Sequence, residues 1–292
     1  MTRKGIILAG GAGTRLHPLT LVVSKQLLPV YDKPLIYYPL TALMLAGIRD
    51  VLVIATPDDA PHFHRLLGDG ARWGISIAYA VQPKPEGLAQ ALVIAAPFLG
   101  GEPSCLALGD NLIYGNGLSQ LLQGANSTDG ATVFAYHVDD PSRYGVVDLD
   151  GAGRPLAIEE KPLAPRSPWA VIGLYFYDGS APDRARALKP SARGEYEITD
   201  LHKSYLADAA LHVVRLGRGF AWFDAGTHAS LLDAGEFIRV VQRRQRYLVG
   251  SPEEVAHAAG WITTEDLARQ ADALGNTEYA ATLKSITLEA AR

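Results

Sequence analysis

Cysteine is almost absent from this sequence, since Cys105 is the only one among 292 residues. A single cysteine can form neither an intrachain disulfide nor a cysteine zinc cluster, which excludes a disulfide-rich secreted scaffold. Excess positive charge is absent too, because 27 basic residues stand against 31 acidic ones and the formal net charge is −4. Uninterrupted apolar runs of about 18 residues, which a membrane-spanning helix needs, are also missing. These absences predict a cytoplasmic protein without nucleic-acid or membrane partners.

Short apolar runs alternate with segments of helical spacing in the first half of the chain. The apolar runs suit strands buried on both faces, and they are residues 6–9, 51–55, 75–80 and 105–108. Helical spacing is found in residues 35–46, with Gly47 as a cap, and in residues 88–96, where we expect Pro97 to end the helix. Pro39 marks either the start of the first helix or a kink in it. The alternation predicts an α/β fold with a Rossmann-like mixed, mostly parallel sheet flanked by helices.

The second half of the chain has a different pattern. Residues 145–151 and 155–159 predict a β-hairpin around an Asp-Gly turn, and residues 171–177 predict a further strand. Residues 227–248 predict a long amphipathic helix, with a basic face that carries Arg239, Arg243, Arg244 and Arg246. Because the chain is net negative, we interpret this face as solvated or as a subunit contact rather than as a nucleic-acid interface. The sequence from Ser251 onward predicts a helical tail.

A glycine-rich loop, residues 8–16 with the sequence LAGGAGTRL, directly follows the first predicted strand. Glycines allow positive φ and a close approach of backbone N–H groups to a phosphate, and Arg15 adds a guanidinium. Lys25 supplies a second cation nearby. The loop lacks the Gly-Lys-Ser/Thr of a P-loop, and Leu16 stands where the third glycine of the dinucleotide fingerprint belongs. We interpret the segment as an anion-binding loop, with a simple tight turn as the alternative.

Two further polar residues follow predicted strands. Gln82 comes after residues 75–80, and Asp110 comes after residues 105–108. Ligands of open α/β sheets bind beyond the carboxyl ends of the strands. Asp110 is therefore either a turn or helix-capping residue or a ligand of Mg²⁺, which commonly uses one or two carboxylates together with substrate phosphates.

An ordered set of segments along nearly the whole chain resembles the sugar-phosphate nucleotidylyltransferases and, within them, the short glucose-1-phosphate thymidylyltransferases. The segments are residues 10–16, 24–29, 82–87, 108–111, 143–147, 159–162, 173–177, 194–200 and 224–228. The glycine loop alone specifies only the superfamily, whereas the ordered set is highly specific. The resemblance implies a catalytic α/β domain over residues 1–250 and a helical tail over 251–292. Within that domain it implies a nucleotide-binding part at about 1–115 and an inserted sugar-phosphate-binding β region at about 116–226.

The resemblance implies transfer of a thymidylyl group from dTTP to α-D-glucose 1-phosphate, giving dTDP-glucose and pyrophosphate. This reaction would be the first step of dTDP-L-rhamnose or other dTDP-deoxysugar synthesis. The implied cofactor is Mg²⁺, held by Asp110 and Asp224 between the phosphates of the two substrates. A homotetramer, and feedback inhibition by a downstream dTDP-sugar at a second site near subunit contacts, are implied as well.

The same resemblance implies roles for individual residues. The catalytic residues would be Arg15 at the leaving pyrophosphate, Lys25 at the reacting phosphate and Lys161 at the sugar phosphate. The nucleotide would contact Gly10, Gly11, Gly13, Thr14, Arg15, Lys25, Gln26, Gln82 and Gly87. Gln82 and Gly87 would lie at the thymine edge, where glycine leaves room for the base. The glucose 1-phosphate pocket would consist of Tyr144, Gly145, Glu160, Lys161 and Val171.

Some features leave other interpretations open. Ile172 and Ala225 stand where the family commonly has threonine, from which we expect altered affinity and not lost chemistry. A related nucleotidyltransferase that uses UTP or another sugar 1-phosphate is the nearest alternative, because a few pocket contacts decide the choice of base and sugar. A non-catalytic nucleotide-sugar sensor on the same fold is an alternative of a different class. An NAD-dependent oxidoreductase is disfavoured by the failed fingerprint.

Overall fold

The computed structural model describes residues 2–11 and 13–290. Ala12 of the glycine loop and residues 291–292 of the tail therefore lie outside the described residues. Within the described part of the chain, no helix combines the length and the apolar character that crossing a membrane requires.

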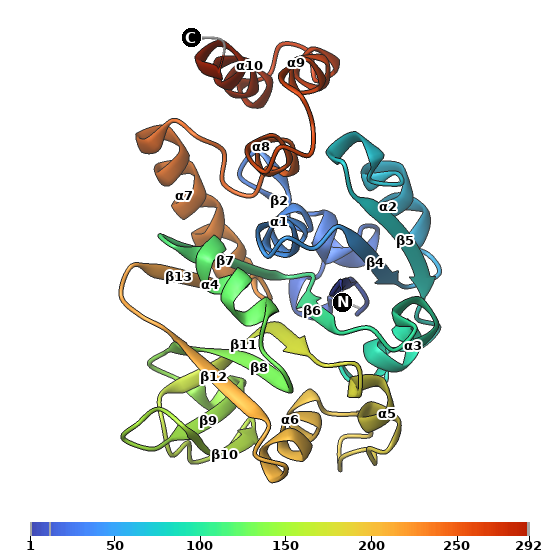
Figure 1. The fold of residues 1–292 in the computed structure, drawn as a ribbon, viewed down its shortest axis with the longest axis vertical. Helices are drawn as coiled ribbons and strands as arrows, with labels where there is room; N and C mark the ends of the chain where they lie inside the picture. Colours follow the sequence, from blue (N-terminus) through green and yellow to red (C-terminus); the bar gives the residue numbers. More distant parts are fainter. Residues whose placement is uncertain (1, 12, 291–292) are drawn as a thin grey trace.

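A mixed, mostly parallel sheet lies at the centre of the molecule and is flanked by helices, as predicted (Figure 1). Four strands from the first 115 residues pair in parallel, and they are β1 (Lys4–Leu8), β4 (Asp50–Ala55), β5 (Ser76–Val81) and β6 (Ser104–Leu108). The strand β11 (Trp169–Tyr177) joins β6 in antiparallel orientation. The remaining strands of the sheet are β8 (Ala131–His137), β9 (Gly145–Leu149), β10 (Pro155–Glu160) and β12 (Leu211–Leu216).

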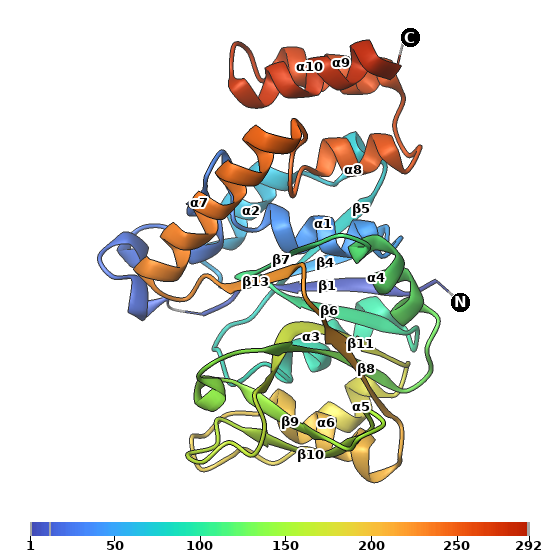
Figure 2. The same cartoon turned by 90° about the vertical axis from the view of Figure 1, so that its left-hand side faces the viewer.

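Each face of the sheet packs against its own set of helices, because alternate residues of a strand point to opposite faces. Ile7 of β1 belongs to the apolar cluster under α1 (Tyr37–Leu45), α2 (Ala60–Leu67) and α4 (Leu118–Asn126). Its neighbour Ile6 belongs to the cluster under α3 (Gln90–Leu99), α5 (Ala181–Arg186) and α6 (Ile198–Ala207). Figure 2 shows the two layers of helices on either side of the sheet. Both isoleucines are fully buried, and each contributes about 1.5–3 kcal/mol to folding.

The C-terminal helices stack outward from the sheet in steps (Figure 2). They are α7 (His228–Gln245), α8 (Pro252–Ala258), α9 (Thr264–Ala273) and α10 (Glu278–Ala290). Side chains of Thr227, Ser251 and Thr263 cap α7, α8 and α9 by accepting backbone N–H bonds. The first tail helix, α8, packs on α1 and contributes to the main apolar cluster. In contrast, α9 and α10 share a small cluster of their own with Leu248.

The predicted elements agree with the structure except at Pro97. The four buried strands, the β9–β10 hairpin, the strand β11 and the long helix α7 are all present. Pro39 lies in the first turn of α1, where proline is tolerated. The prediction that Pro97 ends its helix is wrong, because α3 continues to Leu99. The helix ends instead at Gly100, which adopts the left-handed conformation with φ of 61°.

Short elements complete the fold. The strands β7 (Asn111–Gly115) and β13 (Phe220–Asp224) form a separate antiparallel ribbon in which Asp224 lies opposite Asn111. A small hairpin consists of β2 (Pro29–Val30) and β3 (Lys33–Pro34). Short 3₁₀ turns cover Thr14–Leu16, Leu19–Leu21, Lys25–Leu27, Ala71–Trp73 and Pro141–Arg143.

Candidate active site

A cavity of about 430 Å³ lies beyond the carboxyl end of β6 and is lined by both predicted halves of the catalytic domain. The predicted nucleotide-binding part (the nucleotide side) contributes Arg15 and Asp110 to its wall, and the predicted sugar-phosphate-binding part (the sugar side) contributes Asp224. The sugar side contributes Tyr144, Gly145, Glu160, Lys161 and Val171, which are all five predicted sugar-phosphate residues. The fold thus brings together residues that are far apart in the sequence.

The glycine loop begins directly after β1. Gly13 adopts the left-handed conformation, with φ of 57°, and starts the short turn Thr14–Leu16. The hydroxyl of Thr20 donates a hydrogen bond of 2.7 Å to the Gly13 carbonyl, which closes the loop. Leu16 is fully buried, whereas Arg15 lies in the wall of the cavity. Gly11 has φ of 117°, a conformation that favours glycine.

The predicted base-binding residues Gln82 and Gly87 occupy closely packed positions. Gln82 is 2% exposed, and its Nε2 donates a hydrogen bond of 2.6 Å to Oε1 of Gln90. A Cβ at Gly10 would lie 2.2 Å from Oε1 of Gln82, so the glycine loop contacts this amide directly. A Cβ at Gly87 would lie 2.5 Å from the backbone N and O of Tyr196. The structure therefore gives Gly87 a packing reason that the sequence did not reveal, beside the predicted contact with the base.

Lys25 and Gln26 start a short turn that faces the same end of the sheet. The ammonium of Lys25 forms an ion pair with Oδ2 of Asp110, and both side chains are largely buried. Gln26 is 3% exposed, and its Oε1 accepts a hydrogen bond of 2.7 Å from the Ser24 hydroxyl. The sequence placed Lys25 at a phosphate and Asp110 at a metal, and it did not reveal that the two residues pair with each other.

Asp110 and Asp224 lie at the same end of the β7–β13 ribbon. The Ala225 N–H donates a hydrogen bond of 3.1 Å to the Asp110 carbonyl, which holds the two segments together. Burial opposes ionisation of Asp110, but the attraction and hydrogen bond of Lys25 outweigh burial and lower the pKa of Asp110. Burial and the negative charge of Asp110 raise the pKa of Asp224. The site thus holds one well-paired carboxylate beside one that would gain from a further cation.

The sugar side of the cavity is built around Glu160, at the end of β10. Its carboxylate accepts a hydrogen bond from the Thr199 hydroxyl and lies 3.5 Å from Nζ of Lys161 and 3.5 Å from a guanidinium nitrogen of Arg193. Lys161 has φ of 43°, and its N–H donates a hydrogen bond of 2.9 Å to the Tyr144 carbonyl. A positive φ at a residue that is not glycine is a strained conformation, and such strain often accompanies binding sites.

Some residues of the cavity wall received no role from the sequence. They are Leu88, Leu108, Asn111, Arg143, Gly173, Tyr175, Ile198, Thr199, His202 and Trp222. Most of them lie within or beside the motif segments, and this position in the sequence could have marked them as candidates for the site. Trp222 could have been found by strand alternation, because it lies two residues before Asp224 and shares its face. Its ring contacts Tyr144, with ring centroids 4.9 Å apart.

The two positions that depart from the family pattern lie outside this cavity wall. Ile172 and Ala225 are both fully buried, each in an apolar cluster.

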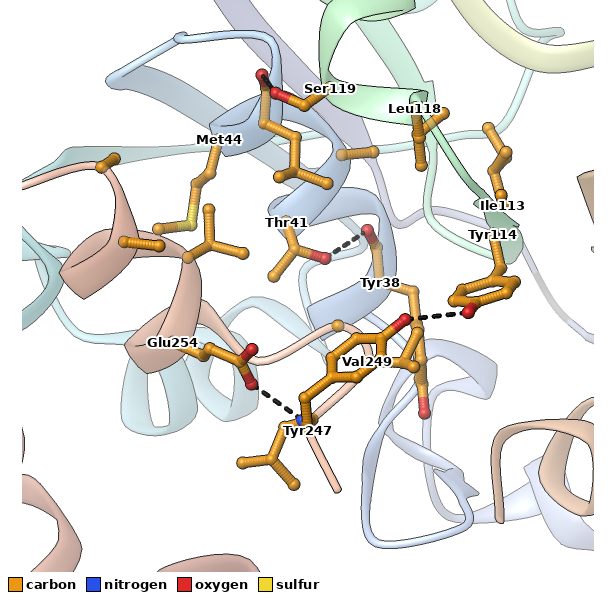
Figure 3. A pocket seen from close by; sticks show the side chains of 18 of the residues that line it. Tyr38, Thr41, Met44, Ile113, Tyr114, Leu118, Ser119, Tyr247, Val249 and Glu254 are labelled. Carbon is orange, nitrogen blue, oxygen red and sulfur yellow. Dashed lines mark hydrogen bonds between the residues drawn. The ribbon is translucent and has the colours of Figure 1, made fainter. Parts of the chain in front are cut away.

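A second, larger cavity of about 940 Å³ shares no lining residue with the first. Figure 3 shows its wall, which comes from α1, β7, the start of α4, residues 247–250 and α8. The hydroxyl of Tyr247 donates to the hydroxyl of Tyr114 over 2.9 Å, and a carboxylate oxygen of Glu254 accepts the Leu248 N–H over 2.8 Å (Figure 3). Burial raises the pKa of Glu254 to about 7.

This chain is similar to known proteins over most of its length. The nucleotidyl transferase family matches residues 4–240. A glucose-1-phosphate thymidylyltransferase of Xanthomonas campestris pv. campestris (strain B100) is 59% identical, over 95% of this chain and 94% of its own. The enzyme of the same name from Mycobacterium tuberculosis (strain CDC 1551 / Oshkosh) is 56% identical, over 94% of this chain and 96% of its own.

Solved structures show the same fold. A chain from Bacillus anthracis described as a glucose-1-phosphate thymidylyltransferase, crystallised with sucrose, has a TM-score of 0.75 and is 40% identical. The match covers 82% of this chain and 96% of that one. A UDP-glucose pyrophosphorylase complexed with UDP-glucose has a TM-score of 0.72 at 22% identity, which supports the fold alone. The chain is thus a nucleotidyltransferase, a member of the nucleotidyl transferase family and, within that family, of the glucose-1-phosphate thymidylyltransferases.

Proposed function

We propose that this protein transfers the thymidylyl group of dTTP to α-D-glucose 1-phosphate, producing dTDP-glucose and pyrophosphate. The observation that carries the proposal is that Asp110 and Asp224 line one cavity together with Arg15 and Lys161. A reaction that joins two phosphate-bearing substrates needs such an arrangement, because negative charge from both substrates meets at the reacting phosphorus.

The two carboxylates suit a Mg²⁺ ion by their chemistry. Mg²⁺ prefers oxygen ligands and commonly binds one or two carboxylates together with substrate phosphates. Burial and the negative charge of Asp110 both disfavour ionisation of Asp224 and so raise its pKa. A cation between the two carboxylates would offset both effects. Among the described residues no group of three or more His, Cys, Asp or Glu side chains could hold a metal, so phosphates and water would supply the other ligands. When bound, Mg²⁺ would offset the charge of the phosphates and bring the two substrates together.

The chain itself contributes positioning and positive charge to the reaction. An oxygen of the sugar phosphate attacks the α-phosphorus of dTTP, while the bond from that phosphorus to the bridging oxygen breaks and pyrophosphate leaves. Arg15 offers a planar pair of donors to the departing pyrophosphate. The ammonium of Lys25, which pairs with Asp110 in the described structure, would also offset charge at the α-phosphate. Lys161 holds the attacking phosphate, so no side chain needs to form a covalent bond.

The ends of the substrates would be held on either side of this centre. Gln82 is buried beside Gly10, and its amide oxygen and the second N–H of its Nε2, which also donates to Gln90, would face a thymine edge. Glu160 can accept hydrogen bonds from sugar hydroxyls, with Thr199 and Lys161 fixing its carboxylate. These two groups would hold the base and the sugar at opposite ends of the reacting phosphates.

Pyrophosphate release, measured with Mg²⁺ over a grid of five nucleoside triphosphates and four sugar 1-phosphates, tests this proposal. The grid pairs dTTP, UTP, ATP, CTP and GTP with the 1-phosphates of glucose, galactose, mannose and N-acetylglucosamine. We expect a maximum at dTTP with glucose 1-phosphate, lost in Asp110→Asn and Asp224→Asn. A maximum at UTP would favour the related enzyme instead. Tight nucleotide binding without release in any combination would favour a nucleotide-sugar sensor.

Regulation by a downstream dTDP-sugar would use the larger cavity. Its volume of about 940 Å³ is ample for a nucleotide sugar, and its tyrosines offer surfaces on which a base can stack. One wall belongs to β7, which directly follows Asp110 in the chain. We expect dTDP-L-rhamnose to inhibit the wild-type protein and Ala258→Trp, which fills part of this cavity, to abolish the inhibition. Ala258→Ser is the matched control, and equal inhibition of both variants would contradict the assignment.

The homotetramer, the cytoplasmic location and the place of the product in dTDP-deoxysugar synthesis remain proposals drawn from the family resemblance. Light scattering of the purified chain tests the first, and a mass of one or two protomers would contradict it.

A further inference from the structure

Asn111 occupies the junction between the nucleotide side and the sugar side of the active-site cavity. It is 7% exposed and starts β7, directly after Asp110. Its Nδ2 donates a hydrogen bond of 2.9 Å to Oδ1 of Asp110. Its Oδ1 accepts the Gly173 N–H over 3.0 Å and the Trp222 indole N–H over 2.7 Å. One carboxamide therefore contacts a predicted metal ligand, the strand β11 and the strand β13.

These partners fix the orientation of the carboxamide. Gly173 N–H and the Trp222 indole are donors only, so they require the oxygen of Asn111 on their side. An ionised Asp110 carboxylate is an acceptor only, so it requires the nitrogen. The reverse orientation would place donor against donor at two contacts and acceptor against acceptor at the third. The amide thus has a single satisfied arrangement.

Packing at Gly173 restrains Asn111 further. A Cβ at position 173 would lie 2.7 Å from Cγ and from Nδ2 of Asn111. The pairing of β11 with β8 is irregular between Val171 and Tyr175, the part of the strand that lines the sugar pocket. Glycine at 173 therefore makes the space into which the Asn111 side chain fits.

We propose that Asn111 is a positioning residue, which holds the Asp110 carboxylate in one orientation and in register with the sugar-binding strand. Lys25 pairs with one oxygen of Asp110, and Asn111 donates to the other, so the carboxylate has little freedom to rotate. Through Gly173 and Trp222 the same amide ties this carboxylate to both strands of the sugar side. The proposal rests on the proposed transfer reaction, because the orientation of Asp110 matters where two substrates must meet at one centre.

Kinetics of two substitutions test the proposal. Asn111→Asp keeps an acceptor for Gly173 and Trp222 but replaces the donor to Asp110 with a repelling oxygen. Asn111→Leu removes all three bonds without adding charge. We expect both to lower kcat by about 10- to 100-fold, as for loss of a hydrogen bond to a charged group, with KM for dTTP within roughly threefold of the wild type. Asn276→Asp, at an exposed position between α9 and α10, is the control for added charge.

A measurement on the protein without substrate or metal provides an independent readout. Each tryptophan gives one indole ¹H–¹⁵N signal, and the Trp222 signal should move in Asn111→Leu while that of Trp73, bonded to Glu253 over 3.1 Å, stays. Gly173→Ala should move the same Trp222 signal and lower kcat in the same way, because it displaces Asn111. A kcat of Asn111→Leu within about twofold of the wild type, or an unmoved Trp222 signal, would overturn the proposal. An inactive wild type would instead overturn the transfer reaction.

Discussion

Gly10 and Gly87 illustrate at the scale of single residues how two glycines of one motif set serve different purposes. The space beside Gly87 is occupied by the backbone of Tyr196, and Gly87 has φ of 115°. We expect Gly87→Ala to destabilise the protein by about 1–3 kcal/mol from backbone strain alone, and by more from the clash. Calorimetry checks this against Gly100→Ala, which has positive φ but open space around it. Equal losses for the two variants would mean that the contact with Tyr196 costs nothing.

Gly10→Ala should instead change recognition of the base. The atom that its Cβ would meet is the end of the flexible Gln82 side chain, so the fold can adjust while the amide moves. We expect kcat/KM for dTTP to fall by about tenfold, with stability within about 1 kcal/mol of the wild type. In a Gln82→Ala background the same change should have no further effect. Additive losses in the double variant would show that Gly10 acts without Gln82.

Glu254 should make stability depend on pH. Burial raises its pKa from 4.5 to about 7, so the folded state disfavours the charged form. In the unfolded chain, Glu254 ionises at a pH near 4.5. The free-energy cost of keeping Glu254 buried therefore grows as pH rises from about 4.5 to 7, and it is complete above about 7. Glu254→Gln, which keeps an acceptor for the Leu248 N–H, should therefore be more stable than the wild type by about 3 kcal/mol at pH 8 and by little at pH 4.5. Melting curves of both proteins at the two pH values measure the difference, and a gain that is the same at both would contradict this cause.

At the scale of elements, Lys33 connects the β2–β3 hairpin to the C-terminal helices. Its side chain is 1% exposed, pairs with Asp32 and donates a hydrogen bond of 2.9 Å to Gln242 of α7. Its ammonium also lies 5.3 Å from the ring centroid of Tyr279 in α10. Lys33→Ala would leave the largely buried Asp32 carboxylate without its cation, so we expect a loss of about 3–5 kcal/mol and faster hydrogen exchange in α10. Lys284→Ala, which breaks an exposed ion pair with Asp272, should cost about 0–1 kcal/mol. Similar losses in the two variants would contradict the role of Lys33.

Elements with strong local signals were predicted, and those fixed by distant contacts were not. Buried strands such as β4 show as apolar runs, and α7 shows as an amphipathic repeat. The end of α3 was misplaced because packing held the chain helical past Pro97 until Gly100. The parallel pairing of β12 with β8 leaves no local pattern, since the two strands lie far apart in the sequence. The Lys33 contacts join three elements and were invisible for the same reason.

At the scale of the whole molecule, the family resemblance named eight residues that line the cavity but not how they contact one another. The other predicted nucleotide-binding residues, among them Lys25 and Gln82, do not line it. The order of the sheet places β6 between β1 and β11, so the end of β6 with Asp110 lies between the two halves. That order depends on which strands pair across long stretches of chain, and a single sequence does not specify it. The Lys25–Asp110 pair and the Asn111 contacts follow from this juxtaposition, so the sequence alone could not reveal them.

One cavity built from two halves should bind the two substrates through separable contacts. dTDP-glucose would contact both halves of the cavity. At the same ligand concentration we therefore expect it to raise the melting temperature more than either dTTP or glucose 1-phosphate does. Gln82→Ala should weaken stabilisation by dTTP and spare glucose 1-phosphate, whereas Lys161→Ala should do the reverse. A tenfold weaker Kd lowers the stabilisation at saturating ligand by about 1.4 kcal/mol, which melting curves resolve.

Arg154→Ala, at a side chain 80% exposed on the β9–β10 hairpin, is the control and should change the stabilisation by neither substrate. If Lys161→Ala weakened dTTP as much as glucose 1-phosphate, the two halves would not bind independently, and the division of the cavity into a nucleotide side and a sugar side would be wrong.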